Sequence, residues 1–167
     1  MNLEMVIFRV LHIIFGVFWT GTAMFMAIIL EPRLRALGPT VQRPVMGALA
    51  PIMTPVMLAS GTITIAAGVY LSLRLRWGHL DQFLDTGWGW AILIGLIASI
   101  GAFASGFGIA HHGQRMVRLG AAIQGRPPTP EEAQQLQRTA AMLTRLGRTT
   151  AILTVVAVVT MAAARYL

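Results

Sequence analysis

The stretch from Val10 to Leu30, VLHIIFGVFWTGTAMFMAIIL, decides the fold of this chain. It carries no Asp, Glu, Lys or Arg, and its one ionisable side chain is His12. The hydrocarbon core of a bilayer is about 30 Å thick, so a helix needs about 20 mostly apolar residues to cross it. Extended back to Leu3, the stretch predicts a membrane-spanning helix over about 3–30, closed by the sequence Glu31-Pro32-Arg33.

Three further apolar segments follow, over about 44–73, 88–112 and 145–166. The second contains Pro44, Pro51 and Pro55, which spanning helices tolerate when neighbours satisfy the freed carbonyls. We therefore expect a kink in its first half.

The fourth helix is expected to begin well before its apolar run. Thr129-Pro130-Glu131-Glu132 combines an N-cap residue, a proline at the first position and acids in the first turn, which together predict a helix start. Arg126-Pro127-Pro128 just before it marks a break. The third and fourth helices are thus predicted to extend beyond the bilayer and to join in a hairpin.

Composition favours the same architecture. The chain has 167 residues, of which 56% are hydrophobic and 11% charged, whereas soluble domains carry about 25% charged residues. All 13 basic residues are arginines, and the net charge is +7. They lie at the ends of apolar segments, where they meet lipid headgroups, so we expect a lipid bilayer and no nucleic acid as partner. The sequence predicts one domain, an all-α integral membrane four-helix bundle.

Arginine placement predicts the orientation in the cell membrane, because cytoplasmic loops are enriched in basic residues. The connections after the first and third segments hold nine arginines: Arg33, Arg35, Arg43, Arg115, Arg118, Arg126, Arg138, Arg145 and Arg148. The opposite side holds four: Arg9, Arg74, Arg76 and Arg165. We therefore expect the helix 3–4 hairpin in the cytoplasm and both termini outside.

His12 is the strongest candidate functional residue, because an ionisable group within a spanning helix is costly. His12, Gly16, Trp19, Ala23 and Met26 recur at helical spacing on one face. A neutral imidazole is a common haem or metal ligand, and the glycine one turn away leaves room for a flat ring. The alternative is a buried histidine that hydrogen-bonds a neighbouring helix.

The other three histidines are also candidate cofactor ligands, and His111 is also a candidate metal ligand. His111 and His112 end the third apolar segment, where an interfacial pair touching headgroups is the alternative interpretation. A helix rises 1.5 Å per residue, which places His12 and His111 roughly 20 Å apart in depth. One haem iron cannot take both. A haem on His12 would draw its second ligand from the outer half, where His79 is the available histidine, whereas a site on His111 or His112 would need a partner such as Met26 or Met53.

Other chemistry is weakly represented. The chain has no cysteine, and it shows no nucleophile–base pair, carboxylate pair, phosphate loop or zinc spacing. The spanning segments carry essentially no acids, which argues against a proton-driven transporter. Whether the protein is an enzyme is left open. Two stripes of small residues, Gly61-Thr64-Gly68 and Gly101-Ser105-Gly108, predict close helix packing.

The opening run Leu11-His-Ile-Ile-Phe-Gly-Val-Phe-Trp-Thr-Gly21, with Phe25 and Pro32 after it, resembles the first helix of copper-resistance protein D (CopD)-like membrane proteins. The related J-type protoporphyrinogen oxidases share the pattern. The resemblance covers about 34 residues and the four-helix topology. It implies a small helical bundle that binds haem b through His12. It does not extend to the oxidase activity, since that family uses a lysine in its third helix and this chain has no lysine.

Three functional hypotheses follow. The first is a membrane haem b protein in electron transfer, or the membrane subunit of a redox complex. The second is a non-catalytic membrane scaffold that docks a partner through the hairpin around Arg126. The third is transport of a metal ion such as copper. A homo-oligomer or a redox partner subunit is compatible with each.

Overall fold

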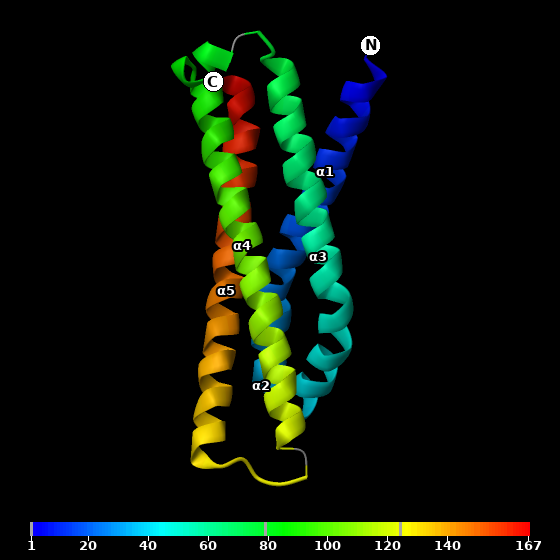
Figure 1. Cartoon of the computed structure of the whole chain (residues 1–167), viewed down its shortest axis with the longest axis vertical. Coiled ribbons are helices and arrows are strands. Elements are labelled where there is room, and N and C mark those ends of the chain that lie inside the picture. The colour runs from blue at the N-terminus through cyan, green and yellow to red at the C-terminus, as the bar shows by residue number, and fades with distance from the viewer. Residues whose placement is uncertain (1, 79, 124) are drawn as a thin grey trace.

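The computed structural model describes residues 2–78, 80–123 and 125–167, and these residues form helices and connections without any strand. Four long helical segments run along one axis, up and down in turn (Figure 1). Both termini lie at one end of the bundle, which is also where the connection between the second and third helices lies. The prediction of an all-α chain with four long helices is confirmed.

The first helical segment is longer than predicted. It comprises α1 (Leu3–Met24), a π-helical turn (Phe25–Leu30) and α2 (Glu31–Leu37). The predicted end at Glu31-Pro32-Arg33 is wrong, because the chain stays helical until Gly38, whose φ of 83° ends it. Pro32 lacks the N–H that would bond four residues back, and in the wider turn the Glu31 N–H bonds the Met26 carbonyl instead.

The second segment, α3 (Pro39–Leu75), starts earlier than the predicted residue 44, with Pro39 in its first turn. Pro44, Pro51 and Pro55 all lie inside this helix. Figure 1 shows the half of α3 that holds them to be bowed, as expected where prolines interrupt the hydrogen-bond ladder.

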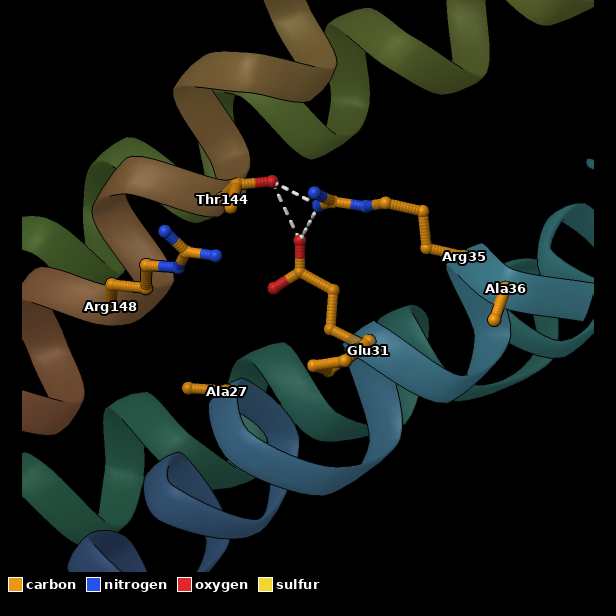
Figure 2. Close-up of a pocket in the computed structure, with 7 residues that line it drawn as sticks. Ala27, Glu31, Arg35, Ala36, Thr144 and Arg148 are labelled. Atoms are coloured by element: carbon orange, nitrogen blue, oxygen red, sulfur yellow. Dashed lines mark hydrogen bonds and ion pairs between the residues drawn. The ribbon is translucent and has the colours of Figure 1, made fainter. Parts of the chain in front are cut away.

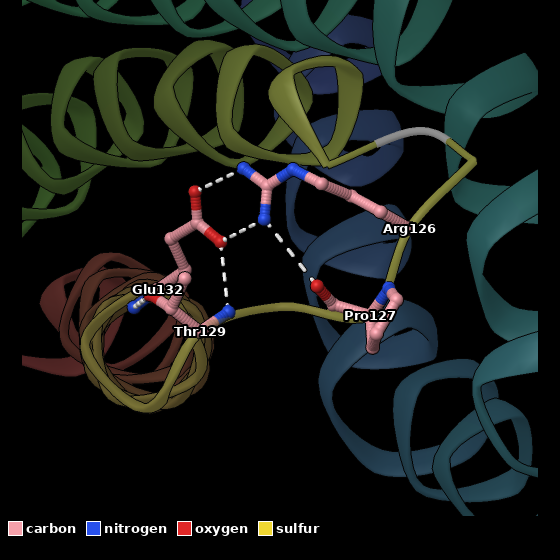
Figure 3. A network of polar contacts seen from close by, with 4 residues as sticks. All are labelled: Arg126, Pro127, Thr129 and Glu132. Atoms are coloured by element: carbon pink, nitrogen blue, oxygen red, sulfur yellow. Dashed lines mark hydrogen bonds and ion pairs between the residues drawn. The ribbon is translucent and has the colours of Figure 1, made fainter.

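The third and fourth segments, α4 (Gly87–Ala122) and α5 (Pro130–Ala163), form a long antiparallel hairpin. α5 begins with the predicted capping motif, since the Thr129 side chain accepts from the Glu132 N–H and the Glu132 carboxylate accepts from the Thr129 N–H. Arg126 adds a bidentate ion pair across the turn, with its guanidinium nitrogens 2.6 and 2.8 Å from the Glu132 carboxylate oxygens (Figure 3). The hairpin turn is thus fixed by local hydrogen bonds.

The connection between α3 and α4 contains a 3-10 helix (Leu80–Asp85). Phe83 packs edge-on against Trp88, and the Arg76 guanidinium lies over the Trp88 ring. Trp77 and Trp90 are exposed at the same end of the bundle. This arrangement is typical of aromatic side chains at a membrane boundary.

Small residues set how closely the helices approach, as the two stripes predicted. A Cβ added to Gly61 would lie 2.9 Å from Phe103 and 3.2 Å from Trp19. On α4, Gly95 faces Thr160 and Met161, Gly101 faces Leu153, and Gly108 faces Leu146. These pairs align α4 against α5 along most of the apolar length, because a glycine lets the neighbouring side chain reach the backbone.

All four segments are long and apolar enough to cross a membrane, and only 11–28% of each apolar window is buried within the bundle. The outer face is rich in large exposed side chains such as Ile13, Val17, Ile97 and Ile152. In water, exposed apolar patches of this extent lead to association. The surface therefore suits a hydrocarbon environment.

Candidate functional site

His12 lies on α1 with its ring against the backbone of α3. A Cβ added to Gly68 would lie 2.7 Å from His12 Cε1, so the ring occupies the space that any other residue at position 68 would fill. Gly16, one turn along α1, faces Thr64 in the same way, at 3.3 Å. Gly68 on α3 therefore makes the room for the His12 ring, whereas Gly16, the glycine predicted to do so, faces Thr64.

The His12 ring is held by one interhelical hydrogen bond. Its Nδ1 lies 2.8 Å from the Thr64 carbonyl oxygen. A carbonyl only accepts, so Nδ1 is the protonated nitrogen. In the neutral ring Nε2 then keeps its lone pair, which is the tautomer that second-shell carbonyls select in metal-ligating histidines. The bond agrees with the alternative interpretation of His12 as a histidine that hydrogen-bonds a neighbouring helix. It also leaves Nε2 available as a ligand.

A small cavity of about 50 Å³ lies beside His12, in the half of the bundle nearer the termini. All four helical segments contribute to its wall, with the side chains or backbone of His12, Gly16, Trp19, Thr20, Thr64, Ser99, Thr154, Ala157, Val158 and Met161. Val158 is 49% exposed. The cavity therefore reaches the outside of the bundle next to α5.

Three hydroxyl groups in this wall donate within their own helices. Thr64 bonds the Ser60 carbonyl, Ser99 bonds Gly95, and Thr154 bonds Thr150 and Ala151. With their protons committed, these oxygens have only lone pairs to offer. These three oxygens of an otherwise largely apolar wall can therefore accept from a bound ligand or contact a cation.

Met161 is a wall residue with a ligand atom that the sequence pattern does not indicate. Its thioether packs against Gly95 on α4 and lines the same cavity as His12. Methionine sulfur is a soft ligand for haem iron and for copper. Met161 lies near the end of the chain, far from His12 in sequence. Only the antiparallel register of α4 and α5 brings it to the cavity beside His12.

An aromatic layer borders the cavity on the side away from the termini. Trp19 is 5% exposed, and its ring meets Phe103 edge-on with centroids 6.4 Å apart. Phe107 continues the layer by packing against Phe103 at 5.1 Å. The layer separates the His12 cavity from the polar groups at the other end of the bundle.

The remaining histidines do not join His12. Ser99 shares the cavity with His12, and His111 lies about 18 Å further along α4 at 1.5 Å per residue, close to the depth difference predicted. His111 is exposed and His112 half-buried, with their rings edge-on at 5.4 Å. His79, the predicted second ligand, lies outside the described residues.

Among the described residues no group of three or more His, Cys, Asp or Glu side chains is placed to hold a metal ion. Any cofactor at His12 would thus depend on this imidazole, on sulfur and on hydroxyl or carbonyl oxygens. Comparison of the chain with known protein families, with curated proteins and with solved structures found no match.

Proposed function

We propose that this chain is a multi-pass membrane protein whose function is centred on His12, acting as the ligand of haem b in one-electron transfer. The observation that carries the proposal is the hydrogen bond from His12 Nδ1 to the Thr64 carbonyl, since it orients the ring and leaves Nε2 unprotonated. The resemblance of the first helix to haem-binding membrane families supports the same cofactor.

The residues that would hold haem iron are His12 and Met161, which line the same cavity. Histidine together with methionine on haem iron would raise its reduction potential. The haem would supply reversible one-electron chemistry. The chain would supply the orientation of the imidazole through Thr64 and a largely apolar wall, which excludes water and further tunes the potential.

The available space tests this assignment. Sites for organic cofactors occupy roughly 300–1,000 Å³, whereas the His12 cavity is about 50 Å³. The donor types fit haem, but the cavity as packed is too small for the macrocycle, so haem binding would require the helices around His12 to separate. The cavity volume favours a second candidate, a single soft ion such as Cu(I), for which His12 Nε2 and the Met161 sulfur are suitable donors.

An absorption spectrum and a metal analysis of detergent-purified protein, expressed with ample haem and copper, distinguish the two. Haem binding predicts a Soret band, and copper binding predicts a colourless protein with stoichiometric copper. His12→Asn should abolish either signal, because the amide can still donate to Thr64 but offers no imidazole nitrogen. His111→Asn is the matched control and should change neither. Protein that lacks both haem and copper would refute both candidates and leave the docking scaffold.

The membrane orientation has its own test, which the lack of cysteine makes direct. A single cysteine at Trp77 or at Pro128 places a thiol at either end of the bundle, since both positions are exposed. An impermeant maleimide added to intact cells should label position 77, and should label position 128 only after lysis. The reverse pattern would invert the proposed orientation, and labelling of both positions would contradict a spanning bundle.

A further inference from the structure

A second, larger pocket lies between the first helical segment and α5, at the end of the bundle away from the termini. Its volume is about 330 Å³, within the range of small-molecule sites. It is lined by Ala27, Glu31, Pro32, Arg35, Ala36, Thr144 and Arg148 (Figure 2). The small side chains of Ala27 and Ala36 leave space for the pocket, and the polar groups gather on one side of it.

The charges of this pocket do not cancel. The Glu31 carboxylate accepts from Arg35 at 2.5 Å and from the Thr144 hydroxyl at 2.7 Å, so Glu31 and Arg35 neutralise one another. Arg148 extends into the pocket beside Glu31. Within the described part of the chain, Arg148 makes no hydrogen bond or ion pair. Its guanidinium is therefore the net positive charge of the pocket, with its donors unused.

The pocket lies where the apolar segments end. The first helical segment is free of acidic and basic residues from Val10 to Leu30 and then reaches Glu31. The last segment is free of them from Thr149 to Ala164, directly after Arg148. In a bilayer this boundary is the depth of the lipid headgroups. One turn into the apolar region, Ile28 and Ile152 are each 63% exposed.

We infer that this pocket binds the phosphate of an acidic phospholipid, with Arg148 as its ligand and the acyl chains along Ile28 and Ile152. The inference rests on the proposed spanning of the membrane. Guanidinium pairs with phosphate oxygens through two parallel hydrogen bonds, and basic pockets between spanning helices on the cytoplasmic side bind acidic headgroups. A net charge of +1 favours phosphatidylglycerol over the zwitterionic phosphatidylcholine.

The test is the thermal stability of delipidated, detergent-purified protein titrated with phosphatidylglycerol. The lipid should raise Tm, whereas phosphatidylcholine and inorganic phosphate should have little effect. Arg148→Gln should weaken the apparent affinity for phosphatidylglycerol, taken from the Tm titration, about tenfold, or about 1.4 kcal/mol. It should not lower Tm in the absence of lipid. Arg145→Gln is the matched control, because Arg145 is an exposed arginine of the same helix that does not line the pocket.

Glu31→Gln separates lipid binding from a purely structural role of these residues. Glutamine can still accept from Thr144 but carries no charge, so the pocket becomes more positive and should bind phosphatidylglycerol more tightly. Weaker binding in this variant, an unchanged response in Arg148→Gln, or an equal response to phosphatidylcholine would overturn the inference. A full response to inorganic phosphate would make the pocket a general anion site and also overturn it. The maleimide assay tests independently whether the chain spans the membrane. Failure of the spanning proposal can therefore be told apart from failure of lipid binding.

Discussion

Gly68→Ala tests whether the close contact between His12 and α3 holds the bundle together. The new Cβ would lie 2.7 Å from His12 Cε1, so the ring must move by about 0.8 Å to restore an ordinary contact of about 3.5 Å. The hydrogen bond to Thr64, now 2.8 Å, would then approach 3.5 Å and be lost. Overpacking costs about 2 kcal/mol and the lost bond about 0.6 kcal/mol, against about 1 kcal/mol gained in helix propensity. We expect a net loss of about 2 kcal/mol.

The assay is equilibrium unfolding in mixed micelles with increasing dodecyl sulfate, followed by far-UV circular dichroism. In a His12→Ala background the clash is gone, so Gly68→Ala should stabilise by up to about 1 kcal/mol. The coupling energy between the two positions is then about 3 kcal/mol. Gly47→Ala on the same helix is the control, since nothing lies within 4 Å of its Cβ, and it should not destabilise. Equal costs of Gly68→Ala in both backgrounds would refute the reasoning.

Two further predictions concern the hairpin. Thr129→Ala removes the capping box of α5 and should destabilise the hairpin by about 1 kcal/mol, seen as faster amide exchange in its first turn, whereas Thr129→Ser should not. The hydrogen bond from Arg126, together with the Thr129 N–H, lowers the pKa of Glu132 from 4.5 to about 2. The folded hairpin is therefore favoured above about pH 4.5 and loses this contribution as the pH falls towards 2. A carboxyl NMR titration should show this pKa rising in Arg126→Gln; a wild-type value near 4.5 would contradict the pairing.

The parts of the site that could be predicted are those whose signals lie within one segment of the sequence. His12 was identifiable because a histidine in an otherwise apolar run of about 20 residues has a high desolvation cost. The capping box at Thr129 was identifiable because all its members lie within four residues. The separation of His12 from His111 followed from helix rise alone. None of these requires knowledge of which helices are neighbours.

The errors and omissions have a common origin in contacts between segments. The sequence predicts that the first helix closes at Glu31-Pro32-Arg33, whereas the chain forms a π-helical turn before Pro32 and stays helical to Leu37. Glu31 at this point pairs with Arg35 one turn along and also accepts from Thr144 of α5. The extension α2 packs against α3, and its Glu31 and Arg35 bond Thr144 of α5, and helix propensity includes neither of these contacts.

The sequence by itself determined the four apolar helices, because the length and composition needed to cross a bilayer are properties of single segments. It also determined the start of α5, since a capping box satisfies backbone donors locally. Only the tertiary structure decided that Gly68 receives the His12 ring, that Met161 joins His12 at one cavity, and that Arg148 extends into the Glu31 pocket. These arrangements depend on the register and rotation of one helix against another, which side-chain packing between distant segments fixes.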